Sequence, residues 1–345
     1  MQTTTIKLTL KKKVDHWLKT LPEELRNKVA PNVIVTGGSI ASMLLGEKVN
    51  DYDIYFRDIN TVKYIADYYV NKFKEKEGQP KFKYGGDVGI YVVTEYQGNM
   101  IASSRADDKL PFEFETQKAP EDRVKIVIKS AGAASEDENA TPTFDHDNGG
   151  YQYFEGVDPE NGEQAEYIDK LVETVEKSNY TKNKGEYKPV FLSANAITLS
   201  DDVQLVIRFF GEPDQIHENY DFVHCTSYYD YGKNILVTPA KALEALLDRR
   251  LYYVGSKYPL CSMIRMRKFI NRGWKISAGQ ILKCAMQLSE LDLSDMATLE
   301  EQLTGVDAAY FHQLITALKE HASENGGNMN RVDQTYLGAL IDRIV

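Results

Sequence analysis

The sequence predicts an α+β protein, with a mixed-sheet domain at residues 1–238 followed by an α-helical domain at residues 239–345. Two observations predict this order. Before Pro239, short apolar or alternating runs typical of strands are interspersed with helical patterns. After Pro239, apolar residues recur at helical spacing almost to the end of the chain. A chain of 345 residues is long enough for two such domains.

The first 76 residues alternate between helical and strand patterns. Residues 11–30 are expected to form a helix, and NVIVTGG at 32–38 is a short apolar strand that ends in paired glycines. SIASMLLGE at 39–47 is typical of a helix that begins at its serine. DYDIYFRD at 51–58 alternates as a strand does, and NTVKYIADYYVNKFKEK at 60–76 is an amphipathic helix. This order favours a core of strands covered by helices.

The middle of the chain combines β-rich runs with a long polar segment. Residues near 131–165 are rich in glycine, serine and acidic residues, which indicates an exposed acidic insertion. The predicted strands are GIYVVTEY at 89–96, RVKIVIKS at 123–130, VQLVIRFF at 203–210 and YDFVHCTSYY at 220–229, and a helix is predicted for YIDKLVETVEKS at 167–178.

Charge and composition indicate the cellular location of the protein and its expected binding surface. The net charge of −10 is unevenly distributed, because residues 241–275 carry nine Lys and Arg side chains against two acids. That basic stretch is the expected phosphate-facing surface. No apolar run is long enough to span a membrane, the N-terminus lacks a secretory signal pattern, and the three cysteines form no CxxC pair. We therefore expect a cytoplasmic protein without a membrane partner.

Five residues, the paired glycines among them, form a pattern that indicates a phosphate-binding and metal-binding site. Gly37 and Gly38 lie between a predicted strand and helix, where backbone N–H groups can approach a triphosphate closely. The Ser39 hydroxyl can donate to a phosphate oxygen. Asp51 and Asp53, at i and i+2 of a strand, point to one face and can together hold Mg²⁺ or Mn²⁺. This combination suits nucleotidyl transfer from a nucleoside triphosphate (NTP).

A metal site of this kind needs a third carboxylate on a neighbouring strand. We predict Asp221, in the apolar run YDFVHC, as that residue and as the third catalytic and metal-binding aspartate. Asp201, Asp202 and Glu113 are the alternatives. His224 follows Asp221 by three residues and is interpreted as a core histidine rather than a ligand.

The string GGSIASMLLGEKVNDYDI at 37–54 resembles the signature of DNA polymerase β-like nucleotidyltransferases, and most of all that of the poly(A) polymerase and CCA-adding head domain. LSANAIT at 192–198 and the stretch 243–277 are similar to later motifs of those enzymes, and the chain also resembles nucleotidyltransferase-type proteins of large tailed bacteriophages. The resemblance implies a polymerase β-like fold that transfers NMP to an acceptor hydroxyl, in the host cytoplasm if the protein is phage-encoded.

The resemblance also implies binding roles outside the paired glycines. Asn195 is expected to contact a ribose or base, and the acceptor is expected to be an RNA 3′ end, as in tRNA-acting relatives. Ala41 and Ser42 replace the Arg-Asp usual after the glycines, so CCA addition itself is not implied. A protein or small-molecule hydroxyl, and a non-catalytic nucleotide- or RNA-binding protein, are the alternatives. The residues expected to contact phosphate or nucleic acid are Arg265, Arg267, Lys268 and Arg272.

Overall fold

The computed structural model divides the chain into two compact units. The first consists of Met1–Ile216 with Tyr228–Val237, and the second of His217–Ser227 with Thr238–Val345. The predicted acidic insertion, the predicted helix at 167–178 and Glu113 lie outside the described residues. The structure describes residues 2–74, 89–103, 122–129, 185–192, 195–303, 318 and 331–344.

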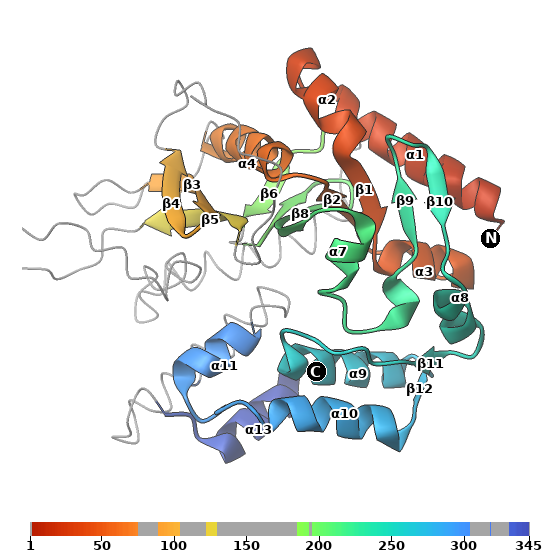
Figure 1. Cartoon of the computed structure of the whole chain (residues 1–345), viewed down its shortest axis with the longest axis vertical. Helices are drawn as coiled ribbons and strands as arrows, with labels where there is room; N and C mark the ends of the chain where they lie inside the picture. Colours follow the sequence, from red (N-terminus) through yellow and green to blue (C-terminus); the bar gives the residue numbers. More distant parts are fainter. Residues whose placement is uncertain are drawn as a thin grey trace, which may run out of the picture. The chain divides into compact units, whose positions relative to one another are not determined.

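A seven-stranded sheet forms the centre of the first unit, in the order β10-β9-β1-β2-β8-β7-β6 (Figure 1). The β2–β8 pair is parallel and the other pairs are antiparallel, which confirms an α+β architecture with a mixed sheet. The strands are β1 (Val33–Thr36), β2 (Tyr52–Phe56), β6 (Pro189–Leu192), β7 (Ala196–Leu199), β8 (Val203–Phe210), β9 (Tyr228–Asp230) and β10 (Ile235–Val237).

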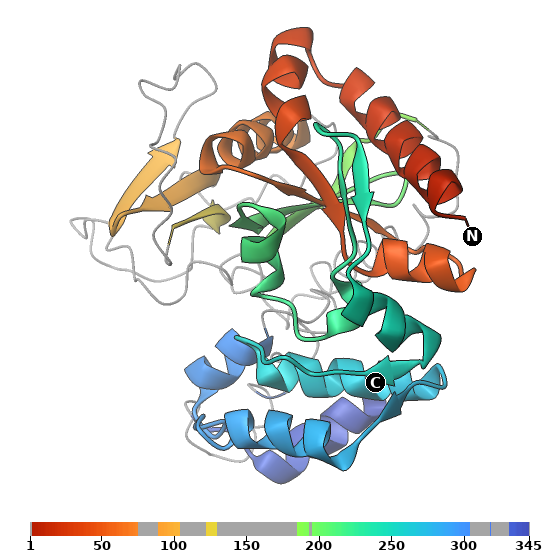
Figure 2. The same cartoon turned by 45° about the vertical axis from the view of Figure 1, so that its right-hand side comes forward.

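Helices α1 (Thr3–Lys19) and α4 (Ile59–Lys74) pack on one face of this sheet, as two views show (Figures 1 and 2). Buried side chains of α1 and α4 share one hydrophobic core with alternate residues of β1, β2 and β8. The single helix predicted at 11–30 was wrong. The structure has α1 and then α2 (Glu23–Val29), separated at Pro22, whose ring clashes with the preceding turn of a continuing helix.

A smaller three-stranded sheet belongs to the same unit. It consists of β3 (Gly89–Tyr96), β4 (Asn99–Ser103) and β5 (Arg123–Lys129), in the order β4-β3-β5, and all its pairs are antiparallel. The structure confirms the two strands that the sequence predicts here, β3 and β5. Val92, Val124 and Ile126 join the core of the large sheet.

The second unit is mainly helical in its described part. Its helices are α8 (Ala240–Leu247), α9 (Pro259–Asn271), α10 (Ala278–Leu288), α11 (Met296–Leu303) and α13 (Gln334–Ile344). Two short strands that the sequence did not predict, β11 (Arg250–Leu251) and β12 (Lys275–Ile276), pair in parallel. Helices thus follow Pro239 in the described residues, as the sequence pattern indicates, and the domain bounds of 1–238 and 239–345 stay a prediction.

The strand predicted at 220–229 was wrong for most of its length. The structure has a 3₁₀ turn at Val223–Cys225 there, and only its end contributes to β9. Phe222 and His224, which belong to the second unit, each have 1% of their surface exposed. The Phe222 ring contacts Phe269, and the His224 ring contacts Phe269 and Trp274. Burial among aromatic rings, rather than strand pairing, therefore accounts for the apolar character of this run.

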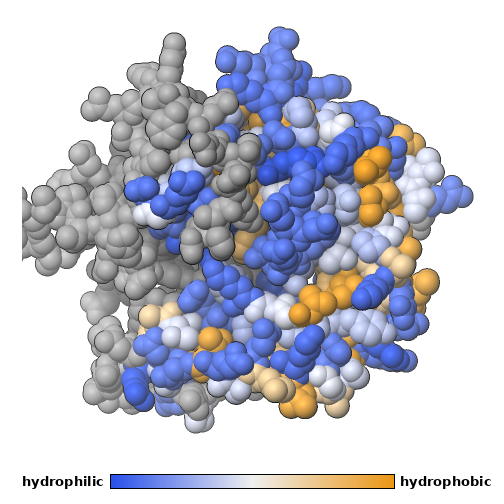
Figure 3. Space-filling view, in the orientation of Figure 1, coloured by the Kyte–Doolittle hydropathy of each residue, from blue (hydrophilic) through white to orange (hydrophobic). Residues whose placement is uncertain are grey.

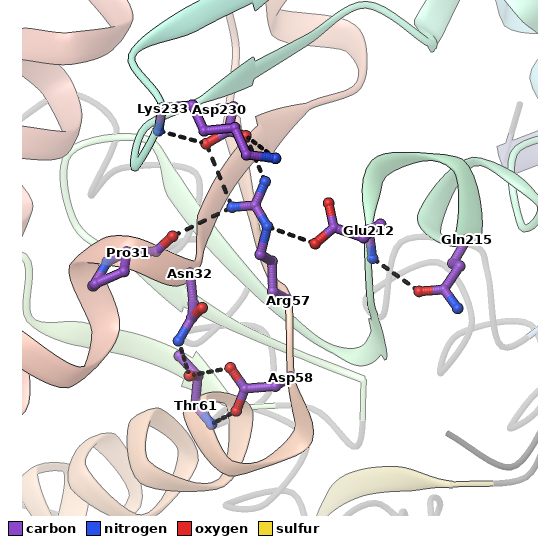
Figure 4. A network of polar contacts seen from close by, with 9 residues as sticks. All are labelled: Pro31, Asn32, Arg57, Asp58, Thr61, Glu212, Gln215, Asp230 and Lys233. Atoms are coloured by element: carbon purple, nitrogen blue, oxygen red, sulfur yellow. Dashed lines mark hydrogen bonds and ion pairs between the residues drawn. The ribbon is translucent and has the colours of Figure 1, made fainter. Parts of the chain in front are cut away.

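A polar network fixes the far end of β2 (Figure 4). The Arg57 guanidinium lies between the carboxylates of Asp230 and Glu212, at 2.5 Å and 2.8 Å. Burial by itself raises the pKa of Asp230. The hydrogen bonds from Arg57 and from the backbone N–H of Lys233, together with the charges of Arg57 and Lys233, outweigh this effect and leave that pKa below its ordinary value. The network joins β2 to the loop after β8 and to the β9–β10 hairpin.

The described residues on the face drawn in Figure 3 are mostly hydrophilic. Large exposed hydrophobic side chains such as Leu247, Leu282 and Met286 are present, and in Figure 3 the hydrophobic residues form separate patches among hydrophilic ones. Isolated patches of this kind are ordinary on protein surfaces. Among the described residues, no helix is long and apolar enough to cross a membrane.

Candidate functional site

The turn between β1 and α3 (Gly38–Leu45) is built by two glycines with different roles. Gly37 caps the helix at φ 92° and ψ −154°, a conformation that strains residues with a side chain. Gly38 has no such constraint, and a Cβ added to it would meet nothing within 4 Å. Folding therefore requires glycine at the first position, whereas at the second it leaves open space beside the helix N-terminus.

Ser39 lies in the first turn of α3 with only 3% of its surface exposed. Its hydroxyl oxygen is buried and has no hydrogen-bond partner in the part of the chain that the structure describes. A buried hydroxyl without a partner costs about 1–3 kcal/mol, so such groups are rare unless a ligand or ion uses them. The helix N-terminus beside it favours an anion.

The two predicted aspartates lie next to this turn. In the antiparallel β1–β2 pair, Asp53 is the register partner of Thr36, the last residue before Gly37. Ile54 is fully buried in the core on the helix-covered face of the sheet, so Asp53 points to the opposite face. Asp51 directly precedes β2 and is exposed. The structure thus brings Gly37, Gly38, Ser39 and this carboxylate pair together.

On the other side of β2, strand β8 contributes Gln204. In the parallel β2–β8 pair, Gln204 is the register partner of Asp53, and its neighbours Val203 and Leu205 belong to the core. The Gln204 side chain therefore projects from the same face as Asp53. Sequence reasoning missed this residue, because the pairing of β8 with β2 cannot be read from either strand alone.

Asp201 and Asp202, two alternative ligands, form the β7–β8 turn beside the start of β2. The backbone N–H of Tyr52 donates to the carbonyl oxygen of Asp202 at 2.8 Å. The Lys13 ammonium donates to the carbonyl oxygen of Asp201 and lies 4.9 Å from the ring centre of Tyr52. Burial lowers the pKa of Lys13, and the charges of Asp202 and then Asp201 partly oppose that shift. These carboxylates therefore interact with α1 and its side of the sheet.

Asn195 lies immediately before β7. Its side-chain oxygen accepts a hydrogen bond from the Arg208 guanidinium at 3.2 Å, and its carbonyl oxygen accepts bonds from the backbone N–H groups of Ile207 and Arg208. Asn195 thus anchors one end of the β7–β8 pair. A contact with a ribose or base remains a prediction.

Asp221 belongs to the second unit, whereas Asp51 and Asp53 belong to the first. The Asp221 carboxylate is paired with the Arg265 guanidinium at 2.6 Å, so two residues predicted for separate roles bind each other. In the described ranges, no three His, Cys, Asp or Glu side chains form a metal-binding group. The roles of Asp221 as a metal ligand and of Arg265 as a phosphate contact stay predictions.

The other basic residues predicted to contact nucleic acid lie at the end of α9. Arg267 and Lys268 are exposed on the helix, and the exposed Arg272 follows its last residue. The β11–β12 pairing adds Arg250 beside Lys275, both exposed. Within the described residues, no ion pair involves the side chains of Arg250, Arg267, Arg272 or Lys275.

The fold and the site together define the class of this protein. It is an α+β protein in which a mixed sheet places a Gly-Gly-Ser helix start beside two aspartates. The chain belongs to the Gabija anti-defense 2 family, whose model matches residues 8–249, more than half of the chain.

One relative is a protein of Bacillus phage SPbetaL7, described as "Gabija anti-defense 2". It is 19% identical over 114 residues, which are 33% of this chain and 28% of the phage protein. The similarity thus spans less than a third of that relative's length. No solved structure matches the chain.

Proposed function

We propose that the protein is a metal-dependent nucleotidyltransferase with a polymerase β-like fold in its first unit. It transfers NMP from an NTP to an acceptor hydroxyl, which loses its proton, and it releases pyrophosphate. The observation that carries this proposal is the buried Ser39 hydroxyl without a partner, next to the open space at Gly38 and the Asp53 carboxylate. The hydroxyl can donate a hydrogen bond to a triphosphate, the open space can accommodate the triphosphate, and the carboxylate can bind its cation.

Each residue of this site has a separate role. The backbone N–H groups at Gly38 and Ser39 and the Ser39 hydroxyl donate to phosphate oxygens at the start of α3. Asp51 and Asp53 would hold Mg²⁺ or Mn²⁺, whose preference for oxygen ligands matches carboxylates. A cation held there would supply neutralisation of phosphate charge and activation of the acceptor hydroxyl. The protein's contribution is to position these groups, and position and charge provide most of the catalysis in phosphoryl-group chemistry.

The acceptor that we favour is an RNA 3′ end. Exposed cations without carboxylate partners, in the described part of the second unit, suit a polyanion. They are Arg250, Arg267, Arg272 and Lys275. Transfer to a protein or small-molecule hydroxyl is the alternative reaction. The family description and the name of the phage relative support a biological role against the Gabija defence, in which nucleotidyl transfer is the activity that counteracts it.

Labelled nucleotides test the reaction directly. The full chain is incubated with Mg²⁺, a host extract containing RNA and protein, and α-labelled ATP, CTP, GTP or UTP in turn. The wild type is expected to transfer label. The transfer rate of Asp53→Asn should be lower by at least about a hundredfold, because a neutral amide replaces a metal-binding carboxylate. Nuclease and protease digestion then identify the acceptor class. Absence of transfer by the folded wild type with all four nucleotides would contradict the proposal.

A plating assay separates catalysis from simple binding. Wild type and Asp53→Asn are expressed in a bacterial host that carries Gabija, and phage plaques are counted. Restored plating with wild type alone supports an enzymatic role. Equal restoration by both forms would favour a non-catalytic binding protein.

A further inference from the structure

We propose that Gln204 is a neutral oxygen ligand of the divalent cation held by Asp51 and Asp53, in the place where the sequence predicted a third carboxylate. This inference rests on the proposed function, because it concerns the same site. It assigns a residue that has no acidic side chain and that lies far from the Gly-Gly-Ser and aspartate motif in the sequence.

Strand register carries the placement. Asp53 pairs with Thr36 on one side and with Gln204 on the other, so Gln204 is its direct neighbour on β8. Paired residues of parallel strands point to the same face, and their strands lie about 4.8 Å apart. Ile54 and Leu205, the next pair along the two strands, are both 0% exposed in the core on the opposite face. Gln204 and Asp53 therefore project side by side away from the core.

Two of the competing carboxylates interact with other residues. Asp202, two residues before Gln204, interacts with Lys13 and Tyr52 on the α1 side of the sheet. Asp221 is paired with Arg265 in the second unit. By contrast, the structure shows no hydrogen bond of the Gln204 side chain within the described residues, although this side chain is half-buried. An amide oxygen beside Asp53 is thus available to a cation.

The chemistry of the amide gives the proposal a measurable consequence. Glutamine carbonyl oxygens bind hard divalent cations, but they add no charge. Two aspartates and one glutamine carry a charge of −2, whereas three carboxylates carry −3. A glutamate at position 204 should therefore strengthen cation binding, and removal of the amide should weaken it.

The experiment measures binding of Mn²⁺ alone to the full chain by electron paramagnetic resonance, in which free and bound Mn²⁺ give different signals. The variants are Gln204→Ala, Gln204→Glu and Asp53→Asn. Thr198→Glu is the matched control, because Thr198 is the register partner of Gln204 on the far side of β8. It places the same charge on the same face, one strand further from Asp53. Thermal melting of each variant confirms that it is folded.

We expect Gln204→Ala to weaken Mn²⁺ binding by about tenfold and Gln204→Glu to strengthen it by about tenfold, with less than about a threefold change for Thr198→Glu. Unchanged affinity in folded Gln204→Ala, while Asp53→Asn loses binding, would overturn the role of Gln204 and leave the proposed function intact. Equal strengthening by Thr198→Glu and Gln204→Glu would reduce the effect to long-range charge and also overturn it. Unchanged binding in Asp53→Asn would instead contradict the proposed function itself.

Discussion

At the scale of single residues, polar groups that are buried without partners are the most informative feature of this protein. Ser39 is one example, in the first unit, and His224 is another, in the second. Both ring nitrogens of His224 are buried and unpartnered in the described structure, although the ring is surrounded by Phe222, Phe269 and Trp274. Ser39 lies beside open space and favours a ligand, whereas aromatic packing around His224 favours a structural role.

Gly38→Ala tests the open space at the glycine turn. The added methyl group meets nothing within 4 Å and the backbone φ is ordinary, so folding stability should be unchanged or slightly higher. NTP binding should nevertheless weaken by about tenfold, because the methyl group occupies the approach to the helix N-terminus. Calorimetric titration with ATP and Mg²⁺ measures the affinity, and thermal melting measures stability.

Gly279→Ala is the matched control for that substitution. Gly279 also lies in the first turn of a helix, α10, with nothing within 4 Å of an added Cβ. It should leave ATP binding at the wild-type level. If both variants lost ATP binding to the same extent, or if both kept it, the result would argue against a phosphate site at Gly38.

His224→Phe should alter the pH dependence of stability. Burial lowers the pKa of His224 to about 4, against a smaller opposing effect of Asp221. Because folding lowers this pKa, the folded protein favours the neutral ring. The free energy of unfolding is therefore highest above about pH 6.5 and falls as the pH drops towards 4. From pH 7 to pH 5 the wild type should lose about 2 kcal/mol of its free energy of unfolding through His224. His224→Phe should not show this loss.

Urea unfolding at pH 7 and pH 5 measures that difference. The substitution His16→Phe, at an exposed position of α1, is the control and should retain the wild-type loss. A pH dependence in His224→Phe as steep as in wild type would show that His224 is not buried as a neutral ring.

At the scale of elements, β2 connects the candidate site to the rest of the first unit. Asp51 directly precedes this strand and Asp53 lies at its start, and its end leads into the Arg57 network with Asp230 and Glu212. Because β2 lies between β1 and β8, its position determines which residues flank Asp53. The network thus helps to keep the register that the site requires.

Arg57→Met should destabilise the protein by about 3 kcal/mol. Asp230 is only 1% exposed, so removal of Arg57 leaves a buried carboxylate without its strongest partner. Lys11→Met removes the partly exposed pair with Asp15 and should cost less than about 1 kcal/mol. Chemical denaturation compares the two. Similar losses in both variants would mean that the Arg57 network contributes no more than a surface ion pair.

At the scale of the whole molecule, the chain passes between the two units three times. Residues 217–227 leave the first unit, join the second and return at Tyr228, before the chain enters the second unit again at Thr238. Phe222 and His224 on this excursion contact rings of residues after 238. The two units are therefore interleaved in sequence.

A fragment of residues 1–238 should consequently expose apolar surface. Without residues 239–345, Phe222 and His224 lose the rings that bury them, so the fragment should bind the dye ANS more strongly than the full chain. Replacement of residues 217–227 by a Gly-Ser linker in the same fragment should reduce that binding. Weak ANS binding by the unmodified fragment would show that the excursion folds without the second unit.

The local pattern was enough to predict β1, α3, β2 and α4, because apolar periodicity and the paired glycines lie within short windows. It was also enough to place Asp53 on the face opposite Ile54, since alternation along one strand decides that. The same reasoning failed at 220–229, where burial among rings from distant residues produces an apolar run without a strand. It also overlooked Pro22, which separates α1 from α2.

The sequence by itself determined the order β1, α3, β2 and α4, the Gly-Gly-Ser helix start and the aspartate pair, because these depend on residues close together in the chain. The tertiary structure decided which strand lies beside β2, and therefore that Gln204 rather than a carboxylate neighbours Asp53. It also decided that Asp221 is bound to Arg265. Both results depend on register and packing between distant segments, which no local periodicity encodes.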